Sequence, residues 1–323
     1  MMDEREILSR LLQPLARDPA ARGFLDDAAV LAPALGRHIV LTHDVIACGI
    51  HYLPQCPPAD IGWKLAAVNL SDLAGKGARP IGVLMGLGLS AAEDALWLEA
   101  FLKGFAKALD AYACPLLGGD TVMGLDKAVL GVTALGDVAA NQALDRRGAR
   151  AGDDLYVSGT IGDAGLGLHI ARGEAPADKF LLNRYRRPSP RVALGQALIA
   201  LAHGAMDISD GLWLDAQRMA QASGVALEIE IETIPLSDAA RARRGDDVAA
   251  RLWLGGAGDD YELLWTAAPD RRAAVEALGG QLGLPISRIG RVVAGAGVRL
   301  VDSLGAEHQP PRWGYAHGAK TPA

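Results

Sequence analysis

The stretch Asn69-Leu70-Ser71-Asp72-Leu73-Ala74-Gly75-Lys76-Gly77 places two polar side chains in a longer apolar run, residues 61–78. The spacing of the apolar residues predicts a buried helix, so Asn69 and Asp72 fall where the pattern would bury them. A buried carboxylate persists only when it is paired, hydrogen-bonded or bound to a metal ion. Lys76, four residues after Asp72, would supply an ordinary ion pair within the helix. Otherwise the partner of Asp72 must come from elsewhere in the chain.

Length and composition favour a protein of two domains. With 323 residues, of which 50% are hydrophobic and 22% are charged, the chain can form about two domains with substantial cores. It contains no apolar run of the roughly 20 residues needed to cross a membrane, and its first residues do not have the layout of a signal peptide. We therefore expect a cytoplasmic protein without a membrane partner.

Cysteine content and charge exclude further classes of protein. Three cysteines without C-x-x-C spacing argue against a disulfide framework and against a structural zinc site. The formal net charge is −6, and the cluster Arg146-Arg147-Gly148-Ala149-Arg150 is too short to form a basic patch. We therefore expect no nucleic-acid partner. An acidic protein that handles anions must recruit cations.

Strands and helices alternate along the whole chain. Strands are predicted at residues 28–31, 38–42, 81–89, 115–117, 129–135, 154–158, 205–208, 227–231, 261–266 and 288–293. Helices are predicted at residues 4–17, 61–76, 91–112, 191–202, 210–223 and 273–278, and after the glycine series Gly159, Gly162, Gly165 and Gly167. This alternation indicates the α/β or α+β class. A shift in composition over residues 138–152 marks the domain boundary, which gives domains of residues 1–139 and 140–323.

Acidic residues recur at the ends of predicted strands or beside glycines. They are Asp26, Asp27, Asp44, Asp120, Asp207 and Asp210, and Asp72 joins them from the predicted helix. Magnesium prefers oxygen ligands and takes one or two carboxylates per ion, together with water and substrate phosphates. Carboxylates at several strand ends can converge on one cleft, so the pattern is compatible with a magnesium site.

Each candidate residue also has an ordinary structural explanation. Asp120 follows two glycines and could be a turn residue. Asp207 or Ser209 could cap the helix that follows them. His51 could be a half-buried structural ring, and Arg146 could be a solvated charge in the linker.

Several nucleotide-binding motifs are absent from the sequence. The chain has no G-x-x-x-x-G-K-[ST] sequence and neither the H-R-D nor the D-F-G motif of protein kinases. The glycine series after Ser158 matches a dinucleotide fingerprint only in part, because no acidic residue is clearly placed to bind a ribose. Any nucleotide chemistry must therefore depend on metal ions for charge neutralisation.

The ordered set of motifs is more specific than any one of them. It consists of Asp26-Asp27-Ala28-Ala29-Val30, Thr42-His43-Asp44, Gly49-Ile50-His51-Tyr52, Ala67-Val68-Asn69-Leu70-Ser71-Asp72-Leu73-Ala74, Gly118-Gly119-Asp120-Thr121, Asp207-Ile208-Ser209-Asp210-Gly211, Asp260-Tyr261-Glu262-Leu263-Leu264 and Gly314-Tyr315-Ala316-His317. In this order, and nearly from end to end, the set resembles the motifs of the thiamine-monophosphate kinases. That family belongs to the aminoimidazole-ribonucleotide-synthetase-like superfamily.

The resemblance implies a fold and a reaction. The fold is the two-domain PurM-like fold, in which N-terminal sheets pair into a barrel across a homodimer. Residues 1–139 would bind ATP and metal, and the α/β C-terminal domain, residues 140–323, would complete the active-site cleft. The reaction is the ATP-dependent phosphorylation of thiamine monophosphate to thiamine diphosphate by direct in-line transfer, with several Mg²⁺ ions.

The resemblance also implies roles for individual residues. The magnesium ligands would be Asp27, Thr42, Asp44, Asp72, Asp120, Asp207 and Asp210. ATP would contact Gly119, Asp120, Arg146 and Ser209, and thiamine monophosphate would contact His51, Asp259 and Tyr315. We assign no general base, because phosphoryl transfer depends mainly on positioning and electrostatics and the acceptor is already an anionic oxygen.

Three positions depart from the family pattern. His43 stands where the family usually has a second Thr, Asp259 replaces a Glu that contacts the substrate, and Leu102 replaces a Tyr near the nucleotide. These differences concern substrate geometry more than the class of reaction. Two alternatives remain open: a related ATP-dependent enzyme with another substrate, and a nucleotide-binding homologue without catalytic activity.

Overall fold

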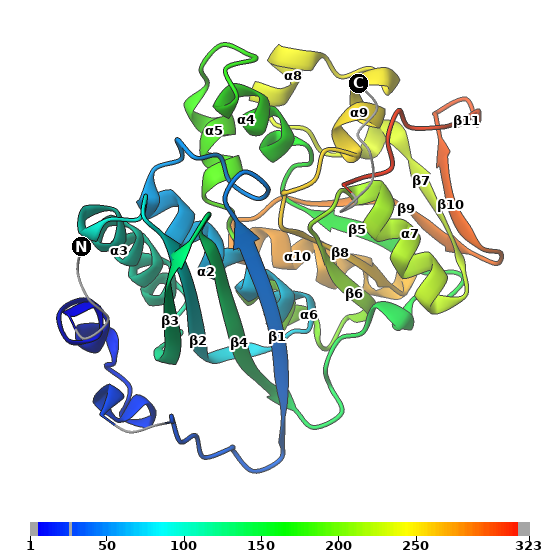
Figure 1. The fold of residues 1–323 in the computed structure, drawn as a ribbon. Coiled ribbons are helices and arrows are strands. Elements are labelled where there is room, and N and C mark those ends of the chain that lie inside the picture. The colour runs from blue at the N-terminus through cyan, green and yellow to red at the C-terminus, as the bar shows by residue number, and fades with distance from the viewer. Residues whose placement is uncertain (1–5, 26–27, 316–323) are drawn as a thin grey trace. The chain divides into compact units, whose positions relative to one another are not determined.

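Residues 6–25 and 28–315 are described by the computed structural model, and their contacts divide the chain into two units (Figure 1). The first unit comprises Met1–Leu73, Ala78–Ala143 and Arg186–Val192. The second unit comprises Ala74–Gly77, Leu144–Tyr185 and Ala193–Ala323. Each unit is therefore discontinuous in sequence, and the Asn69 to Gly77 stretch contributes residues to both.

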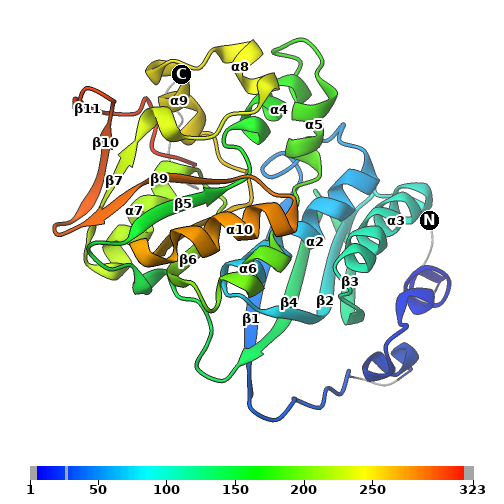
Figure 2. The same ribbon diagram turned by 180° about the vertical axis from the view of Figure 1, so that it is seen from behind.

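A four-stranded sheet is the basis of the first unit. Its strands are β1 (Arg37–Ala47), β2 (Arg79–Ser90), β3 (Leu116–Leu125) and β4 (Val129–Ala139), in the order β1-β4-β2-β3. Only β2 and β3 are parallel neighbours, because α3 (Ala95–Ala111) provides the crossover that a parallel pair requires. The helices α2 (Pro58–Gly75) and α3 cover one face of the sheet (Figure 2).

The two faces of this sheet differ in exposure. On β2, Val83, Met85 and Leu87 are at most 3% exposed beneath the helices, whereas Leu84 is 40% exposed on the other face. Side chains alternate between faces along a strand, so the strand register assigns further residues to that second face. We call it the open face. Its exposed apolar side chains are Ile39, Leu41, Val45, Leu84, Val122 and Val129.

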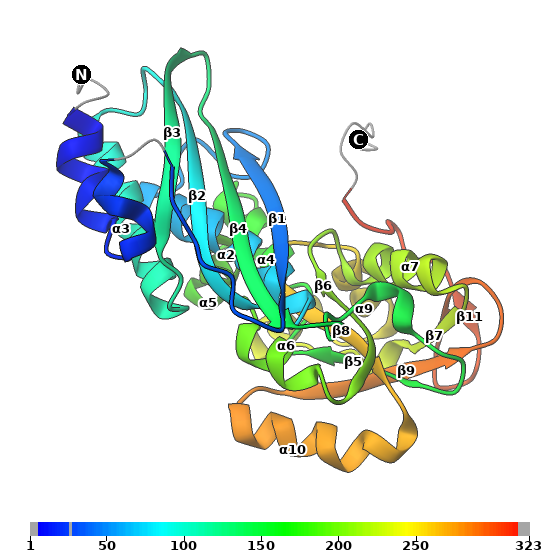
Figure 3. The same ribbon diagram turned by 90° about the horizontal axis from the view of Figure 1, so that it is seen from below.

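Three short helical segments precede β1. They are η1 (Ile7–Leu12), η2 (Gln13–Leu15) and η3 (Pro19–Phe24), and they lie beside α3 and β3 (Figure 3). Asp18 starts η3, because its carboxylate accepts a hydrogen bond of 2.8 Å from the Ala20 N–H. These segments cover the edge strand β3.

The second unit contains a seven-stranded sheet in the order β11-β10-β7-β9-β5-β8-β6. Its strands are β5 (Asp154–Ser158), β6 (Ala202–Ile208), β7 (Ala226–Glu230), β8 (Glu262–Ala267), β9 (Ile286–Val293), β10 (Gly297–Val301) and β11 (Glu307–His308). The main helices are α4 (Asp163–Ala171), α5 (Lys179–Arg186), α6 (Val192–Leu198), α7 (Leu212–Ser223), α8 (Asp238–Arg244), α9 (Val248–Gly255) and α10 (Arg272–Leu282). The helices α7 and α10 lie on opposite faces of the sheet (Figure 3), and Leu155, Trp213 and Leu264 are fully buried in the core.

The predicted class of mixed strands and helices in two units is confirmed, and several elements match closely. The strand predicted at residues 154–158 is β5. The helix predicted at residues 210–223 begins slightly later as α7 and ends at Gly224, whose φ of 67° provides the left-handed C-cap. The strand predicted at residues 38–42 extends through Asp44 to Ala47 as β1.

Two predictions of local structure were wrong, and a third was correct only in part. Residues 28–31 form no strand, because the short apolar run finds no partner strand and the Val30 N–H instead bonds to the Ala20 carbonyl. Of the helix predicted at residues 4–17, residues 7–15 are helical, but as η1 and η2 rather than as one regular α-helix, and Pro14 removes a helix donor in η2. Gly118 to Thr121 do not follow a strand but lie within β3.

The helices α5, α8 and α9 and the strands β10 and β11 were not predicted. Among residues 6–25 and 28–315, no helix combines the length and hydrophobicity needed to span a membrane.

Candidate active site

Polar residues of the Asn-Leu-Ser-Asp stretch join α2 to β1. Asn69 is fully buried; its Oδ1 accepts a 2.9 Å hydrogen bond from the Asp44 N–H, and its Nδ2 donates to the Leu65 carbonyl. The Thr42 hydroxyl donates to Asp72 Oδ2. Since β1 is an edge strand, the Asn69 amide satisfies a backbone donor that no neighbouring strand would reach. The two unexpected polar residues of the helix therefore hold Thr42 and Asp44 against α2.

Alternation along β1 separates the residues of the Thr-His-Asp motif. Thr42 and Asp44 lie on the face that α2 covers, and Asp72 is half-buried there. His43 lies on the open face, where its Nδ1 is 2.9 Å from the Thr133 hydroxyl of β4. The substitution of His for the usual Thr therefore falls on the face away from the Asp72 carboxylate.

Asp120 lies in the middle of β3, so the explanation of this residue as a turn residue is wrong. Its Oδ1 accepts a 2.9 Å hydrogen bond from the Thr121 N–H. The register pairs Asp120 with Gly86 of β2, and Gly86 with Gly131 of β4. These positions belong to the open face. Within one chain, Asp120 and Asp44 therefore lie on opposite faces of the sheet.

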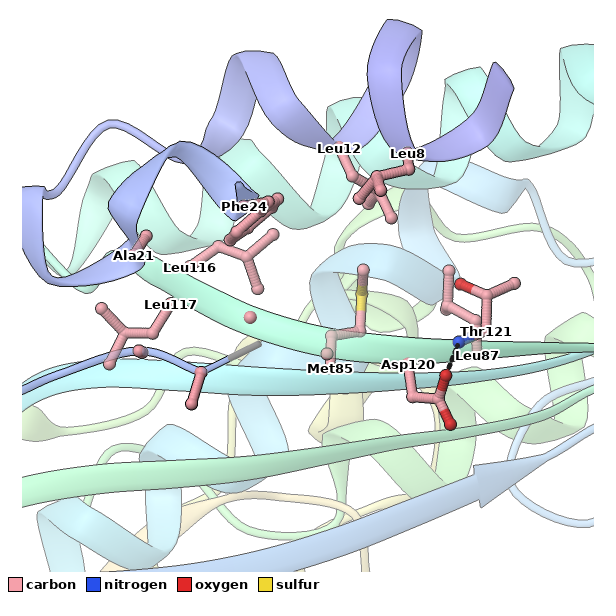
Figure 4. Close-up of a pocket in the computed structure, with 14 residues that line it drawn as sticks. Leu8, Leu12, Ala21, Phe24, Met85, Leu87, Leu116, Leu117, Asp120 and Thr121 are labelled. Atoms are coloured by element: carbon pink, nitrogen blue, oxygen red, sulfur yellow. Dashed lines mark hydrogen bonds between the residues drawn. The ribbon is translucent and has the colours of Figure 1, made fainter. Parts of the chain in front are cut away.

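Gly119 is required by the packing of its own sheet. A Cβ at this position would lie 2.0 Å from the Met85 carbonyl oxygen. Gly119 also borders an apolar pocket under the N-terminal segments, and Figure 4 shows the Asp120 carboxylate pointing away from the apolar walls. Those walls include Leu8, Leu12, Phe24, Met85 and Leu116.

His51 follows β1 and is half-buried. Its Nδ1 accepts a 3.1 Å hydrogen bond from the Ala47 N–H, and its carbonyl accepts one from Lys64 Nζ. Because Nδ1 acts as an acceptor, the neutral ring carries its proton on Nε2. Asp27, the remaining candidate of the first unit, lies outside the described residues.

In the second unit, the Asp-Ile-Ser-Asp motif connects β6 to α7. The explanation of Asp207 or Ser209 as a helix cap is wrong, because the N-cap of α7 is Gly211, without a side-chain hydrogen bond. Instead, the backbone N–H groups of Ser209 and Asp210 both donate to Asp215 Oδ2 at 3.0 Å. A buried carboxylate one turn into the helix thus shapes the turn that precedes it.

Sequence reasoning missed Asp215 and its partner Arg218. Asp215 is fully buried, and burial raises its pKa to about 6. Arg218 Nη1 lies 2.7 Å from Asp215 Oδ1 and 2.6 Å from Asp210 Oδ2, so it links the buried acid to the motif. The available signal was an acid on the apolar face of the predicted helix, between Leu212 and Met219.

Main-chain hydrogen bonds bring four of the candidate residues together in the second unit. The Asp259 N–H donates to the Ser209 carbonyl at 2.7 Å. The Tyr315 N–H donates to the Asp210 carbonyl at 2.9 Å. Asp207 is adjacent in β6 and is half-buried. Residues far apart in sequence therefore meet at the end of β6.

Arg146 lies in the short helix η4 (Arg146–Gly148), and its side chain is exposed. Its backbone carbonyl accepts a 2.7 Å hydrogen bond from the Ser223 hydroxyl at the end of α7. The backbone of η4 is therefore anchored while the guanidinium remains exposed.

No three His, Cys, Asp or Glu side chains converge on a potential metal site in the part of the chain that the structure describes. The candidate donors are all oxygens, namely carboxylates and the Thr42 hydroxyl. Magnesium is commonly held by one or two protein carboxylates, with water and phosphate completing its shell. The donor chemistry fits magnesium and does not fit zinc, which favours nitrogen and sulfur ligands.

Comparisons with known proteins cover nearly the whole chain. The AIR synthase related protein N-terminal domain matches residues 25–138, and the corresponding C-terminal domain matches residues 150–303. The thiamine-monophosphate kinase of Caulobacter vibrioides is 39% identical over 320 residues, which cover 98% of this chain and 91% of that protein.

Two solved structures are also similar. The crystal structure of thiamine-monophosphate kinase from Stenotrophomonas maltophilia has a TM-score of 0.83 and 42% identity, and the match covers 93% of this chain and 96% of that one. A structure of AaThiL complexed with AMPPCP and TMP has a TM-score of 0.77 and 31% identity, over 98% of this chain and 99% of that one.

The chain thus has the two-domain architecture of the AIR synthase related proteins. Within this class, it belongs to the thiamine-monophosphate kinase family. The resemblance inferred from the ordered motifs is confirmed.

Proposed function

We propose that this chain phosphorylates thiamine monophosphate to thiamine diphosphate, with ATP as the phosphoryl donor. Thiamine-monophosphate kinases align with it over nearly its whole length, at 39% identity for the Caulobacter vibrioides protein. A structure that is 31% identical is complexed with AMPPCP, an analogue of ATP, and with TMP. Both ligands are those that the proposed reaction requires.

The observation that carries the proposal is the set of main-chain hydrogen bonds at the end of β6. We assign Ser209 to ATP, Asp210 to metal, and Asp259 and Tyr315 to thiamine monophosphate. The bonds from Asp259 to Ser209 and from Tyr315 to Asp210 hold these residues together. In-line transfer requires donor and acceptor phosphates to be held in fixed mutual positions, so this arrangement supports a phosphotransferase.

We propose that several Mg²⁺ ions bind to the oxygen donors that the sequence singles out. When bound, they would neutralise charge on the nucleotide and on the transferring group. The chain itself positions donors of the first unit, because Asn69 holds the Asp44 backbone and Thr42 holds Asp72. The proposed ligands are Asp27, Thr42, Asp44, Asp72, Asp120, Asp207 and Asp210.

Gly119, Asp120, Arg146 and Ser209 are proposed to contact ATP, and His51 is proposed to contact thiamine monophosphate. The exposed guanidinium of Arg146 suits an anionic phosphate. The Ala47 N–H occupies His51 Nδ1, so His51 would act through its other nitrogen as a hydrogen-bond donor.

We propose that the protein is a homodimer whose four-stranded sheets pair into a barrel through the open face. That face carries six exposed apolar side chains, and a contiguous apolar patch on a soluble protein marks an interaction surface. Asp120 shares this face, whereas Thr42 and Asp44 lie on the covered one. We therefore propose that Asp120 acts at the active site of the second copy.

Residues 1–139 are proposed to form the dimerising domain that binds ATP and metal, and residues 140–323 to complete the active-site cleft. We also propose a cytoplasmic location.

The test is an assay of the purified protein with radiolabelled ATP, Mg²⁺ and thiamine monophosphate. Formation of labelled thiamine diphosphate, lost on addition of a chelator, is the expected result. Two further assays separate this function from that of a related enzyme. One replaces thiamine monophosphate with other phosphate esters, and the other measures ATP hydrolysis without an acceptor. ATP binding without any turnover would contradict the proposal and identify a non-catalytic homologue.

A further inference from the structure

The loop that carries Asp259 has an uncommon backbone conformation. Asp259 has a φ of 64° and Tyr261 has a φ of 51°, in the left-handed region that favours glycine. Such values are rare for a bulky residue and persist only where neighbouring groups hold the backbone in place. The residues proposed to bind ligands do not by themselves explain how residues 258–261 are held.

Part of the constraint on this loop comes from the last residue of β6 and from the residue that follows it. The N–H groups of Asp259 and Tyr261 donate to the carbonyls of Ser209 and Ile208, at 2.7 and 2.8 Å. The Tyr261 hydroxyl lies 3.3 Å from Asp259 Oδ1, to which it donates a hydrogen bond. The two left-handed residues therefore act together, because the Tyr261 hydroxyl orients the carboxylate that Asp259 carries.

The residue between them is directed into the protein. Asp260 is 1% exposed, and its Oδ2 accepts a 2.9 Å hydrogen bond from the Gly162 N–H. Its Oδ1 lies 3.5 Å from the Ala164 N–H. The N-cap of α4 is Gly162, which provides no side-chain cap, so Asp260 satisfies free donors at the start of this helix from another part of the chain. The loop is thereby attached to α4.

Arg184 of α5 connects both sides of the loop. It is 9% exposed, and its Nη2 donates to the Asp260 carbonyl at 3.3 Å and to Glu262 Oε1 at 2.8 Å. Glu262 is fully buried, and its Oε2 accepts a 2.6 Å hydrogen bond from the Ser158 hydroxyl of β5. One guanidinium therefore spans the backbone of the loop and the first residue of β8.

We propose that Arg184, Asp260 and Glu262 form a positioning network that fixes the direction of the Asp259 carboxylate toward thiamine monophosphate. The inference rests on the proposed function, because Asp259 is the proposed substrate contact. A buried ion pair adds little net stability but is costly to break, and it can specify one geometry. Such control matters here because Asp259 is one methylene shorter than the Glu usual in this family and depends more on the position of its backbone.

The test uses Arg184→Gln, Glu262→Gln and the double variant. Arg184→Gln removes the cation beside Glu262 and Asp163, Glu262→Gln removes the closer of these two acids, and the double variant removes both partners of the 2.8 Å ion pair. The matched control is Arg272→Gln, which breaks the 2.6 Å ion pair between Arg272 and the buried Asp154 at the far end of β5. The measurements are kcat, the KM for each substrate and the Tm.

The network variants are expected to raise the KM for thiamine monophosphate about tenfold and to change the KM for ATP less than about twofold. The double variant is expected to recover Tm relative to the single variants while its KM remains raised. The control is expected to lower Tm without changing either KM. A purely structural role would change both KM values by the same factor, in proportion to the loss of Tm. That result would overturn the inference.

Hydrogen exchange at the Asp259 and Tyr261 amides provides a measurement that does not depend on activity. The double variant is expected to exchange about tenfold faster at these amides than the wild type, with no change in the control. Unchanged exchange in the double variant would overturn the network. If the wild type fails to phosphorylate thiamine monophosphate, the proposed function fails, and the exchange result still decides whether the network holds the loop.

Discussion

Asp72 and Thr42 form the polar contact from which the first half of the proposed site is built. The carboxylate is half-buried and accepts the Thr42 hydroxyl, and Asn69, one turn earlier, holds the backbone of Asp44. Two hydrogen bonds, made by the Asp72 carboxylate and the Asn69 amide, thus connect α2 to β1. The cost of placing polar groups in the helix is offset by these bonds.

Replacement of this acid tests its role directly. Asp72→Asn is expected to lower kcat for thiamine diphosphate formation by about 100- to 1,000-fold, because it removes a negative charge proposed to hold magnesium near the transferring group. The amide oxygen can still accept the Thr42 hydroxyl, so circular dichroism and Tm should change little. Asp110→Asn, at an exposed position paired with Arg17, is the control. An active Asp72→Asn protein would refute the assignment.

A second residue-scale prediction concerns pH. Burial raises the pKa of Asp260 from 3.8 to about 8, so the folded state binds this proton more tightly than the unfolded chain does. The contribution of Asp260 to the free energy of unfolding is fully present below the pKa that this group has in the unfolded chain. It is lost as the pH rises toward the pKa of the folded state, with a slope of at most about 1.4 kcal/mol per pH unit. Urea unfolding between pH 5 and 8 should show this fall. Asp260→Asn should flatten it, and an unaltered slope in the variant would contradict the assignment.

At the scale of elements, the junction of α2 and β1 depends on one amide. Asn69→Leu preserves much of the side-chain volume but leaves the Asp44 N–H without its acceptor inside the protein. The free energy of unfolding is expected to fall by about 1–3 kcal/mol, measured by denaturant titration. The exposed Asn183 of α5 provides the comparison, since Asn183→Ala should change stability by less than about 0.5 kcal/mol. Equal effects at both positions would argue against the junction.

At the scale of the whole molecule, the open face makes two predictions about assembly. Leu41 is 65% exposed in one chain and is proposed to be buried in the dimer. Leu41→Asp should therefore convert the dimer to a monomer in light scattering after size exclusion, because an interface does not tolerate an unpaired charge. Leu304→Asp, at a position 92% exposed in the second unit, should leave the mass unchanged. A dimer that survives Leu41→Asp would exclude this face.

The second prediction follows from the opposite orientation of Asp120 and Asp44. Asp120→Asn and Asp72→Asn should each be inactive alone. Mixed after dissociation and reassociation, they should regain about a quarter of wild-type activity, because random pairing makes half of the dimers mixed and each mixed dimer then contains one site without either substitution. No recovery would place Asp120 in the site of its own chain.

Sequence reasoning reached the class of fold, many of the elements and the family. Elements with strong periodicity, such as β5 and α7, were predicted closely because burial of one face imposes a pattern on the sequence itself. The family followed from the order of eight motifs rather than from any one residue. Short elements, such as α5 and α8, were missed, because eight and seven residues span too few turns to establish a helical period. The short apolar run at residues 28–31 was assigned to a strand, although the structure describes no strand there.

Individual contacts depended on tertiary structure. The sequence by itself determined that Asp72 needed a partner, since a polar group in an apolar helix has a desolvation cost that the pattern reveals. Only the folded chain decided that Thr42 supplies that partner, that Asp215 holds the Ser209–Asp210 turn and that Asp120 faces away from Asp44. Spacing along the chain carries information about burial on one element. Which residues of different elements meet is set by strand register and packing, which combine residues that no local pattern connects.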